Sequence, residues 1–174
     1  MDALYIIGEP GAGKSTLVDR LTAGLGYEEA MQPFAHRRYD CGVLEIGRRR
    51  EAFAGTDALS LSVQPTVVTF IEGIRPAMLL AEGDRLANPG FFVALYDFGY
   101  RLHIYELYGP SVAAEQRAYR GSTQDATWLK SRQTKVRRLA ERFGAIRLPA
   151  GAPLADLIDL MGDPVTGRLL GVPA

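Results

Sequence analysis

The chain has 174 residues, of which 47% are apolar and 23% charged, and its basic and acidic side chains balance to a net charge of zero. These values predict one globular domain with a sizeable core, and they exclude a broad basic footprint for nucleic acid, although not a local basic groove. The single cysteine, Cys41, cannot form an internal disulfide, and no apolar run is long enough to cross a membrane. We therefore expect a cytoplasmic protein without a membrane partner.

A short apolar run at Ala3–Ile7 leads directly into the glycine-rich segment Gly8–Ser15. The run predicts a buried parallel strand, and Leu17, Val18 and Leu21 follow at helical spacing. The segment fits the pattern G-x-x-x-x-G-K-S/T, and strand, loop and helix come in the order that a phosphate-binding P-loop requires. The alternative is a glycine-rich turn between strand and helix that binds no ligand.

Consecutive backbone amides of such a loop point at phosphate oxygens. Lys14 would reach the β- and γ-phosphates of ATP, and the Ser15 hydroxyl would complete the shell of a Mg²⁺ ion. Lysine is rare elsewhere, since Lys130 and Lys135 are the only others. The predicted nucleotide-binding residues of this loop are Gly8, Pro10, Gly11, Ala12, Gly13, Lys14, Ser15 and Thr16.

The next part of the chain, about residues 34–64, is predicted to be an acceptor-binding insertion. Phe34–Tyr39 and Val43–Ile46 have the composition of two short strands on either side of a turn. Asp57 lies on a glycine-bearing loop with hydroxyls on both sides, so it can take the proton of an acceptor hydroxyl or cap a helix. The run at residues 48–50, three arginines, either contacts phosphates or forms a solvated face.

Strands and helices alternate through the rest of the chain. The expected elements are a helix over Pro65–Glu72, a strand over Ala77–Ala81, a helix over Phe91–Phe98, a strand over Arg101–Leu107, helices over Ser111–Arg120 and Gln124–Phe143, a strand over Ala145–Leu148 and a helix over Leu154–Met161. This alternation after an N-terminal P-loop predicts an α/β fold, with a doubly wound parallel sheet between two helical layers and a single domain over residues 1–174.

Two acids, Glu82 and Asp84, follow the strand that we expect beside the P-loop strand. Ligands of doubly wound sheets bind beyond the carboxyl ends of the strands, so one acid can hold Mg²⁺ and the other can act as a base. The assignment favoured here gives the metal to Glu82 and a catalytic role to Asp84, but the pattern also fits a turn cap and a solvated side chain. Arg85 can pair with either acid or bind an acceptor phosphate.

Basic residues crowd the segment between the two late helices, at about residues 111–132. Arg117 and Arg120 share a helix face, and Arg132 follows in the next helix, as expected for a lid that closes over ATP and neutralises charge on the transferred group. The alternative is a solvated helix surface. Trp128 can stack on a base or pack in the core.

These motifs resemble the P-loop kinases of the nucleotide-kinase group, which includes thymidylate kinases. The resemblance is carried by Gly8–Ser15, by the segment 82–85 and by the Arg117/Arg120 segment, and it covers nearly the whole chain. It implies transfer of the γ-phosphate of ATP with Mg²⁺, and it admits a homodimer because related kinases are often dimers. The chain is shorter than most thymidylate kinases, and the Asp57 loop is not their acceptor loop.

The segments 55–60, 82–88 and 128–130 also resemble small bacteriophage kinases. Some of those enzymes phosphorylate 5-hydroxymethyluracil within DNA, which would place this protein in the host cytoplasm. The resemblance implies a nucleotide or a modified base in DNA as the acceptor. Two other hypotheses stay open, a kinase of a small-metabolite hydroxyl and a P-loop enzyme that hydrolyses nucleotide without an acceptor.

Overall fold

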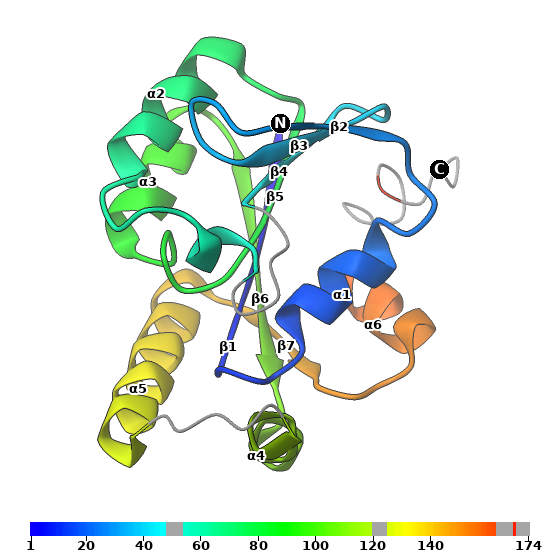
Figure 1. The fold of residues 1–174 in the computed structure, drawn as a ribbon, viewed down its shortest axis with the longest axis vertical. Helices are drawn as coiled ribbons and strands as arrows, with labels where there is room; N and C mark the ends of the chain where they lie inside the picture. The colour runs from blue at the N-terminus through cyan, green and yellow to red at the C-terminus, as the bar shows by residue number, and fades with distance from the viewer. Residues whose placement is uncertain (48–53, 120–124, 163–168, 170–174) are drawn as a thin grey trace.

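The computed structural model describes residues 1–47, 54–119, 125–162 and 169. Its centre is a seven-stranded sheet in the order β2-β3-β4-β5-β1-β6-β7. The strands are β1 (Asp2–Gly8), β2 (Tyr27–Ala30), β3 (His36–Tyr39), β4 (Val43–Ile46), β5 (Met78–Glu82), β6 (Arg101–Tyr108) and β7 (Ile146–Pro149). Figure 1 shows β1 running through the middle of the molecule to the loop before α1.

Strand β1 lies between β5 and β6 and is parallel to both. Its residues from Asp2 to Ile7 are buried, because helices cover both faces of the sheet here, which explains the uninterrupted apolar run. Ile6 pairs with Glu82, so the end of β5 lies beside the start of the P-loop. The predicted adjacency of these two strands is confirmed.

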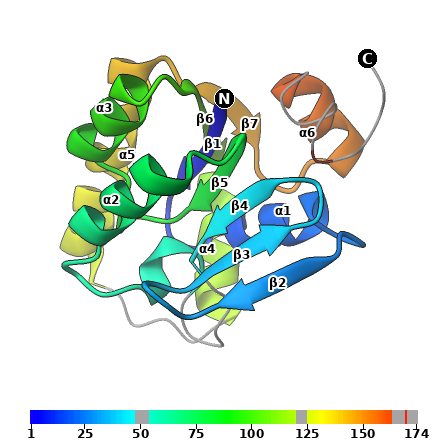
Figure 2. The same cartoon turned by 90° about the horizontal axis from the view of Figure 1, so that it is seen from above.

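The helices are α1 (Lys14–Leu21), α2 (Gln64–Ile74), α3 (Pro89–Asp97), α4 (Pro110–Tyr119), α5 (Ala126–Phe143) and α6 (Leu154–Met161). Figure 2 shows α2, α3 and α5 on one face of the sheet and α1 and α6 on the other. Each face has its own apolar cluster, one around Phe91, Phe92 and Val136, the other around Leu17 and Val18. The predicted α/β fold with three layers is therefore confirmed.

Residues 34–64 contribute two strands to this sheet. Strands β3 and β4 form an antiparallel hairpin, and β4 pairs with β5 in parallel. Strand β2 was not predicted, because Tyr27–Ala30 is short, exposed and contains two glutamates, so it lacks an alternating apolar pattern. It extends the sheet by pairing with β3 alone.

Several helix starts differ from the sequence-based expectation. The prediction that Ser111 caps a helix is wrong, since α4 already begins at Pro110, whose fixed φ suits the first helical position. Helix α3 begins at Pro89 for the same reason, and the Asn88 side chain caps it by accepting a hydrogen bond from the Phe91 amide. Asp125 caps α5 by accepting from the amide of Trp128.

A buried carboxylate lies at the opposite edge of the sheet from the P-loop. Asp2 Oδ1 is 3.0 Å from Arg101 Nε and 2.9 Å from His103 Nε2. Burial alone would raise the pKa of Asp2, but the hydrogen bonds and charges of the two partners outweigh it and hold the pKa below its usual value. This cluster fixes the first residue of β1 to β6. None of the described helices is long and apolar enough to span a membrane.

Candidate active site

The loop between β1 and α1 has the backbone geometry of a phosphate cradle. Gly11 and Gly13 have φ angles of 87° and 89°, which residues with a side chain rarely adopt. Helix α1 begins at Lys14, immediately after Gly13, so its N-terminal amides face the loop. The Lys14 ammonium donates hydrogen bonds to the carbonyl oxygens of Gly8 and Glu9, both at 3.0 Å. The spacing of the motif thus produces a compact loop, with the Lys14 ammonium hydrogen-bonded to the backbone of that loop.

A hydroxyl and a carboxylate meet beside this loop. The Ser15 Oγ donates to Glu82 Oε1 at 2.7 Å, and Glu82 is 3% exposed at the end of β5. Glu82 is therefore not the solvated side chain that one interpretation of the sequence allowed. Both oxygens are hard ligands of the kind that Mg²⁺ prefers, and Mg²⁺ usually completes its shell with water and substrate phosphates. Ser15 and Glu82 are thus oxygen donors of a kind that could hold Mg²⁺, and their role in metal binding stays a prediction.

Asp57 connects two loops at the carboxyl edge of the sheet. Its Oδ1 accepts hydrogen bonds from the backbone amides of Asp84 and Arg85, at 2.8 and 3.0 Å. Asp57 lies within a short 3₁₀ turn, Thr56–Ala58, that Gly55 precedes, so the interpretation of Asp57 as a helix cap is wrong. The contact to the segment after β5 fixes the Asp57 loop next to Glu82, and both of these hydrogen bonds use Oδ1, so that Oδ2 makes no hydrogen bond within the described part of the chain.

Tyr5, a buried residue of β1, contacts both of the loops that Asp57 connects. Its hydroxyl donates to the Gly83 carbonyl at 3.1 Å and lies 3.3 Å from Thr56 Oγ1. Complete burial raises the pKa of Tyr5 well above its usual value, so the hydroxyl stays protonated. A Cβ added to Gly83 would lie 2.7 Å from Thr56 Oγ1, which shows how closely the two loops pack. Sequence reasoning missed Tyr5 and Thr56, because their role depends on contacts between distant segments.

Asp84 connects the site to α5. Its Oδ2 forms an ion pair with Arg132, and its Oδ1 lies 2.7 Å from Lys135 Nζ, which also donates to the Asp84 carbonyl at 2.9 Å. Both carboxylate oxygens therefore already have cationic partners. Arg132, which the sequence assigned to ATP, contacts Asp84 here and also stacks over Trp128, with its Cζ 5.1 Å from the ring centre.

Arg85 has a different environment from its two acidic neighbours. Its guanidinium donates one long hydrogen bond, 3.4 Å from Nη2 to the Asp57 carbonyl, and among the described residues it forms no ion pair with Glu82 or Asp84. The Arg85 Nε is buried and has no hydrogen-bond partner among the described residues. The guanidinium can therefore accept an anion without breaking an existing ion pair.

Helix α4 contacts the P-loop directly. Arg117 Nη1 donates to the Pro10 carbonyl at 2.7 Å, and the same nitrogen lies 3.8 Å from Glu9 Oε2. A Cβ on Gly11 would lie 2.6 Å from the Ala113 carbonyl oxygen, so only glycine allows this approach. The predicted lid segment thus touches the loop that it was expected to cover. Arg120 and the arginine run at residues 48–50 lie outside the described residues.

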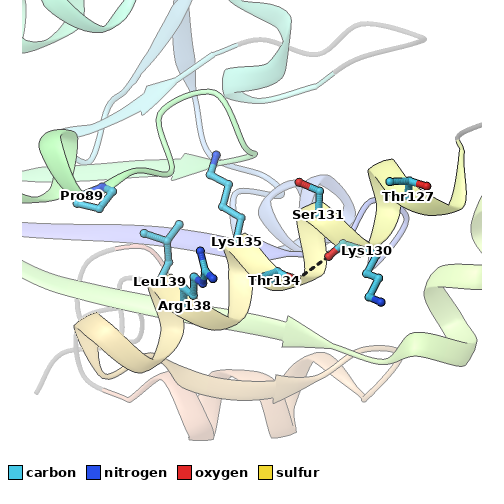
Figure 3. Close-up of a pocket in the computed structure, with 8 residues that line it drawn as sticks. All are labelled: Pro89, Thr127, Lys130, Ser131, Thr134, Lys135, Arg138 and Leu139. Atoms are coloured by element: carbon cyan, nitrogen blue, oxygen red, sulfur yellow. Dashed lines mark hydrogen bonds between the residues drawn. The ribbon is translucent and has the colours of Figure 1, made fainter.

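Two hollows border the site. The smaller, about 160 Å³, adjoins the P-loop and is lined by Ala12, Gly13, Thr16, Leu17, Arg20, Leu107, Val112, Gln116, Gly151, Ala152 and Leu157. It lies at the side of the loop that faces α4, α6 and the turn after β7. The larger lies along α5 (Figure 3), and one of its lining residues, Lys135, forms an ion pair with Asp84.

The sheet order, the P-loop and the covering helices together define the fold of a P-loop kinase. A gluconokinase from Sinorhizobium meliloti 1021 is similar over 98% of this chain and 94% of its own, with a TM-score of 0.53 and 13% identity. A deoxyadenosine kinase from M. mycoides, solved with dCMP and dCDP, is similar over 95% of this chain and 98% of its own, with a TM-score of 0.47 and 11% identity.

Residues 1–156 match the sequence model of the P-loop Nucleotide Kinase3 family, so the chain belongs to that family. No curated protein sequence matches it significantly. The family match confirms the predicted class, a P-loop kinase.

Proposed function

We propose that the protein transfers the γ-phosphate of ATP to a nucleotide-class acceptor, with the hydroxymethyl group of 5-hydroxymethyluracil in DNA or a deoxynucleotide as the leading acceptors. One observation carries this proposal. The segment 82–85 is hydrogen-bonded to the P-loop through Glu82 and to the Asp57 loop through two amides, so a donor site and a carboxylate able to serve an acceptor lie side by side.

On the donor side, the amides from Gly11 to Ser15 and the start of α1 would hold the triphosphate. Lys14 would exchange its two carbonyl contacts for phosphate oxygens, since charge-assisted hydrogen bonds to phosphate are the stronger ones. The hollow of about 160 Å³ beside Thr16 and Gln116 would receive the nucleobase.

Ser15 and Glu82 would hold a Mg²⁺ ion, which when bound neutralises charge on the β- and γ-phosphates. Arg117 lies close enough to the loop to add a positive charge at the transferring group, after releasing the Pro10 carbonyl. A lid over residues 111–132 remains part of this proposal, as does a contribution from Arg120.

On the acceptor side, Asp57 would take the hydroxyl proton with Oδ2 while Oδ1 keeps its two amides. The acceptor oxygen then forms a bond to the γ-phosphorus as the bond to the bridging oxygen of ADP breaks. Arg85 would pair with a phosphate of the acceptor nucleotide. Asp84 acts in this scheme by holding Arg132 and Lys135 in place, and its own catalytic role stays a prediction.

The test is incubation with γ-labelled ATP and a panel of deoxynucleotides, nucleosides, gluconate and oligonucleotides with and without 5-hydroxymethyluracil. We expect label on a nucleotide-class acceptor and none on the unmodified oligonucleotide. Label on gluconate alone would favour the small-metabolite hypothesis. Release of labelled inorganic phosphate at the same rate with and without every acceptor would contradict the proposal.

A further inference from the structure

The larger hollow is a groove of about 510 Å³ along one side of α5. Its lining residues are Pro89, Thr127, Lys130, Ser131, Thr134, Lys135, Arg138 and Leu139. Figure 3 shows the side chains of Thr127, Ser131 and Lys135 projecting from the same side of the helix. We call this feature the α5 groove.

The α5 groove is lined by cations and hydroxyls and by no acidic side chain. Helix α5 carries six basic residues and one acid, Glu141, in a chain whose net charge is zero. Glu141 pairs with Arg137 at 3.7 Å, outside the groove. Lys130 and Arg138 form no ion pair within the described part of the chain. The groove therefore concentrates positive charge that the composition as a whole conceals.

The spacing of the lining residues makes the groove a continuous track. Thr127, Ser131, Thr134 and Arg138 are four, three and four residues apart, so they form one stripe on the helix. At 1.5 Å per residue this stripe is roughly 16 Å long. One nucleic-acid strand with stacked bases rises about 3.4 Å per nucleotide, so this stripe is long enough to contact several successive phosphates. Lysine, arginine, serine and threonine side chains are among the donors that contact the phosphates and sugars of nucleic-acid backbones.

The α5 groove adjoins the acceptor side of the site through one of its lining residues. Lys135 lines the groove and also contacts Asp84, whose amide is bound by Asp57. Trp128 lies on the same helix, is 38% exposed, and holds Arg132 against its ring. An exposed aromatic ring beside a basic groove is the combination on which single-stranded bases stack.

We propose that the α5 groove binds the phosphodiester backbone of a single-stranded nucleic acid, with Trp128 stacking on a base next to the acceptor nucleotide. The inference rests on the proposed function, because it takes the acceptor to be a nucleotide within a nucleic-acid strand. A single strand fits better than a duplex, because a base that is to be modified must leave the stack to reach the Asp57 loop.

The test is fluorescence anisotropy with a fluorescein-labelled, unmodified 12-nucleotide single-stranded DNA, titrated over a range of salt concentrations. The variant Lys130→Ala/Arg138→Ala should weaken binding at low salt at least about tenfold. Each phosphate contact contributes about 0.7 to the slope of log affinity against log salt, so the slope should fall by about 1.4. The matched control, Arg137→Ala/Arg142→Ala, removes the same charge from the same helix outside the groove and should weaken binding less than about threefold.

Equal losses in the two double variants, or no saturable binding by the wild type at low salt, would overturn the inference. Unchanged melting temperatures of both variants exclude misfolding as the cause of a loss. DNA binding is measured without ATP, so a failure of this inference can be distinguished from a failure of the proposed function. Lys14→Ala should bind the DNA normally and transfer no phosphate, whereas DNA binding without transfer to any acceptor would refute the kinase proposal alone.

Discussion

Replacing Asp57 by asparagine and by alanine separates the two roles that its carboxylate has in this account. Oδ1 accepts two backbone amides, and Oδ2 would accept the proton of the acceptor. Asparagine keeps an oxygen that can accept the two amides but cannot act as a base. Alanine removes both functions and leaves the amides of Asp84 and Arg85 without their partner.

The expected stability changes follow from those two hydrogen bonds. A hydrogen bond to a charged group is worth about 1.5–3 kcal/mol, and the loop is only partly buried, so Asp57→Ala should cost about 2–4 kcal/mol. In a domain of this size that lowers the melting temperature by roughly 4–16 °C. Asp57→Asn should cost about 1 kcal/mol, because only the charge assistance is lost.

The activity changes should not follow the stability changes. Loss of a general base lowers kcat by about 10²- to 10⁴-fold, so both variants should lose activity to that degree. Thermal melts and transfer rates from γ-labelled ATP, on the same preparations, measure the two effects. An Asp57→Asn variant with kcat within about threefold of the wild type would refute the base, and an Asp57→Ala variant with an unchanged melting temperature would refute the loop contact.

Three further predictions concern other parts of the fold. Glu82→Gln should raise the Mg²⁺ concentration for half-maximal activity at least about tenfold, measured by Mg²⁺ titration, because a neutral amide is a weaker ligand than a carboxylate; an unchanged titration would exclude Glu82 from the metal site. Gly11→Ala should weaken ATP binding in calorimetry, since its Cβ would clash with α4, and wild-type affinity would contradict the tight approach of α4. The pKa of Asp2 is lowered in the folded state, so its contribution to stability is complete above the unfolded value of about 3.9 and is lost as the pH falls through the folded value. Denaturant titrations should therefore show Asp2→Asn destabilised at pH 7 and a difference from the wild type that shrinks as the pH falls below about 3.9; a constant difference would refute the linkage.

The sequence was sufficient for the features that depend on local pattern. The apolar run before Gly8 and the spacing to Lys14 are local, and they predicted the strand, the loop and the helix correctly. The place of Glu82 followed from the parallel sheet, because the carboxyl ends of neighbouring strands meet at one edge. The α/β architecture came from the same alternation of strands and helices.

The remaining features depend on contacts between segments far apart in the chain. Asp57 holds amides 27 and 28 residues later, and the Tyr5 hydroxyl reaches a carbonyl 78 residues later. No spacing rule predicts such contacts. The two lysines of α5 both line the α5 groove, and Lys135 also forms an ion pair with Asp84, a contact 51 residues apart that the sequence does not show.

The central claim is that phosphate passes to an acceptor and is not merely released to water. Its most direct measurement follows γ-labelled ATP with oligonucleotides that contain 5-hydroxymethyluracil and with free deoxynucleotides, and compares label in the acceptor with label in inorganic phosphate for the wild type and Lys14→Ala. The account predicts acceptor label in excess for the wild type and none for Lys14→Ala. Label in inorganic phosphate alone, or transfer unchanged in Lys14→Ala, would contradict it.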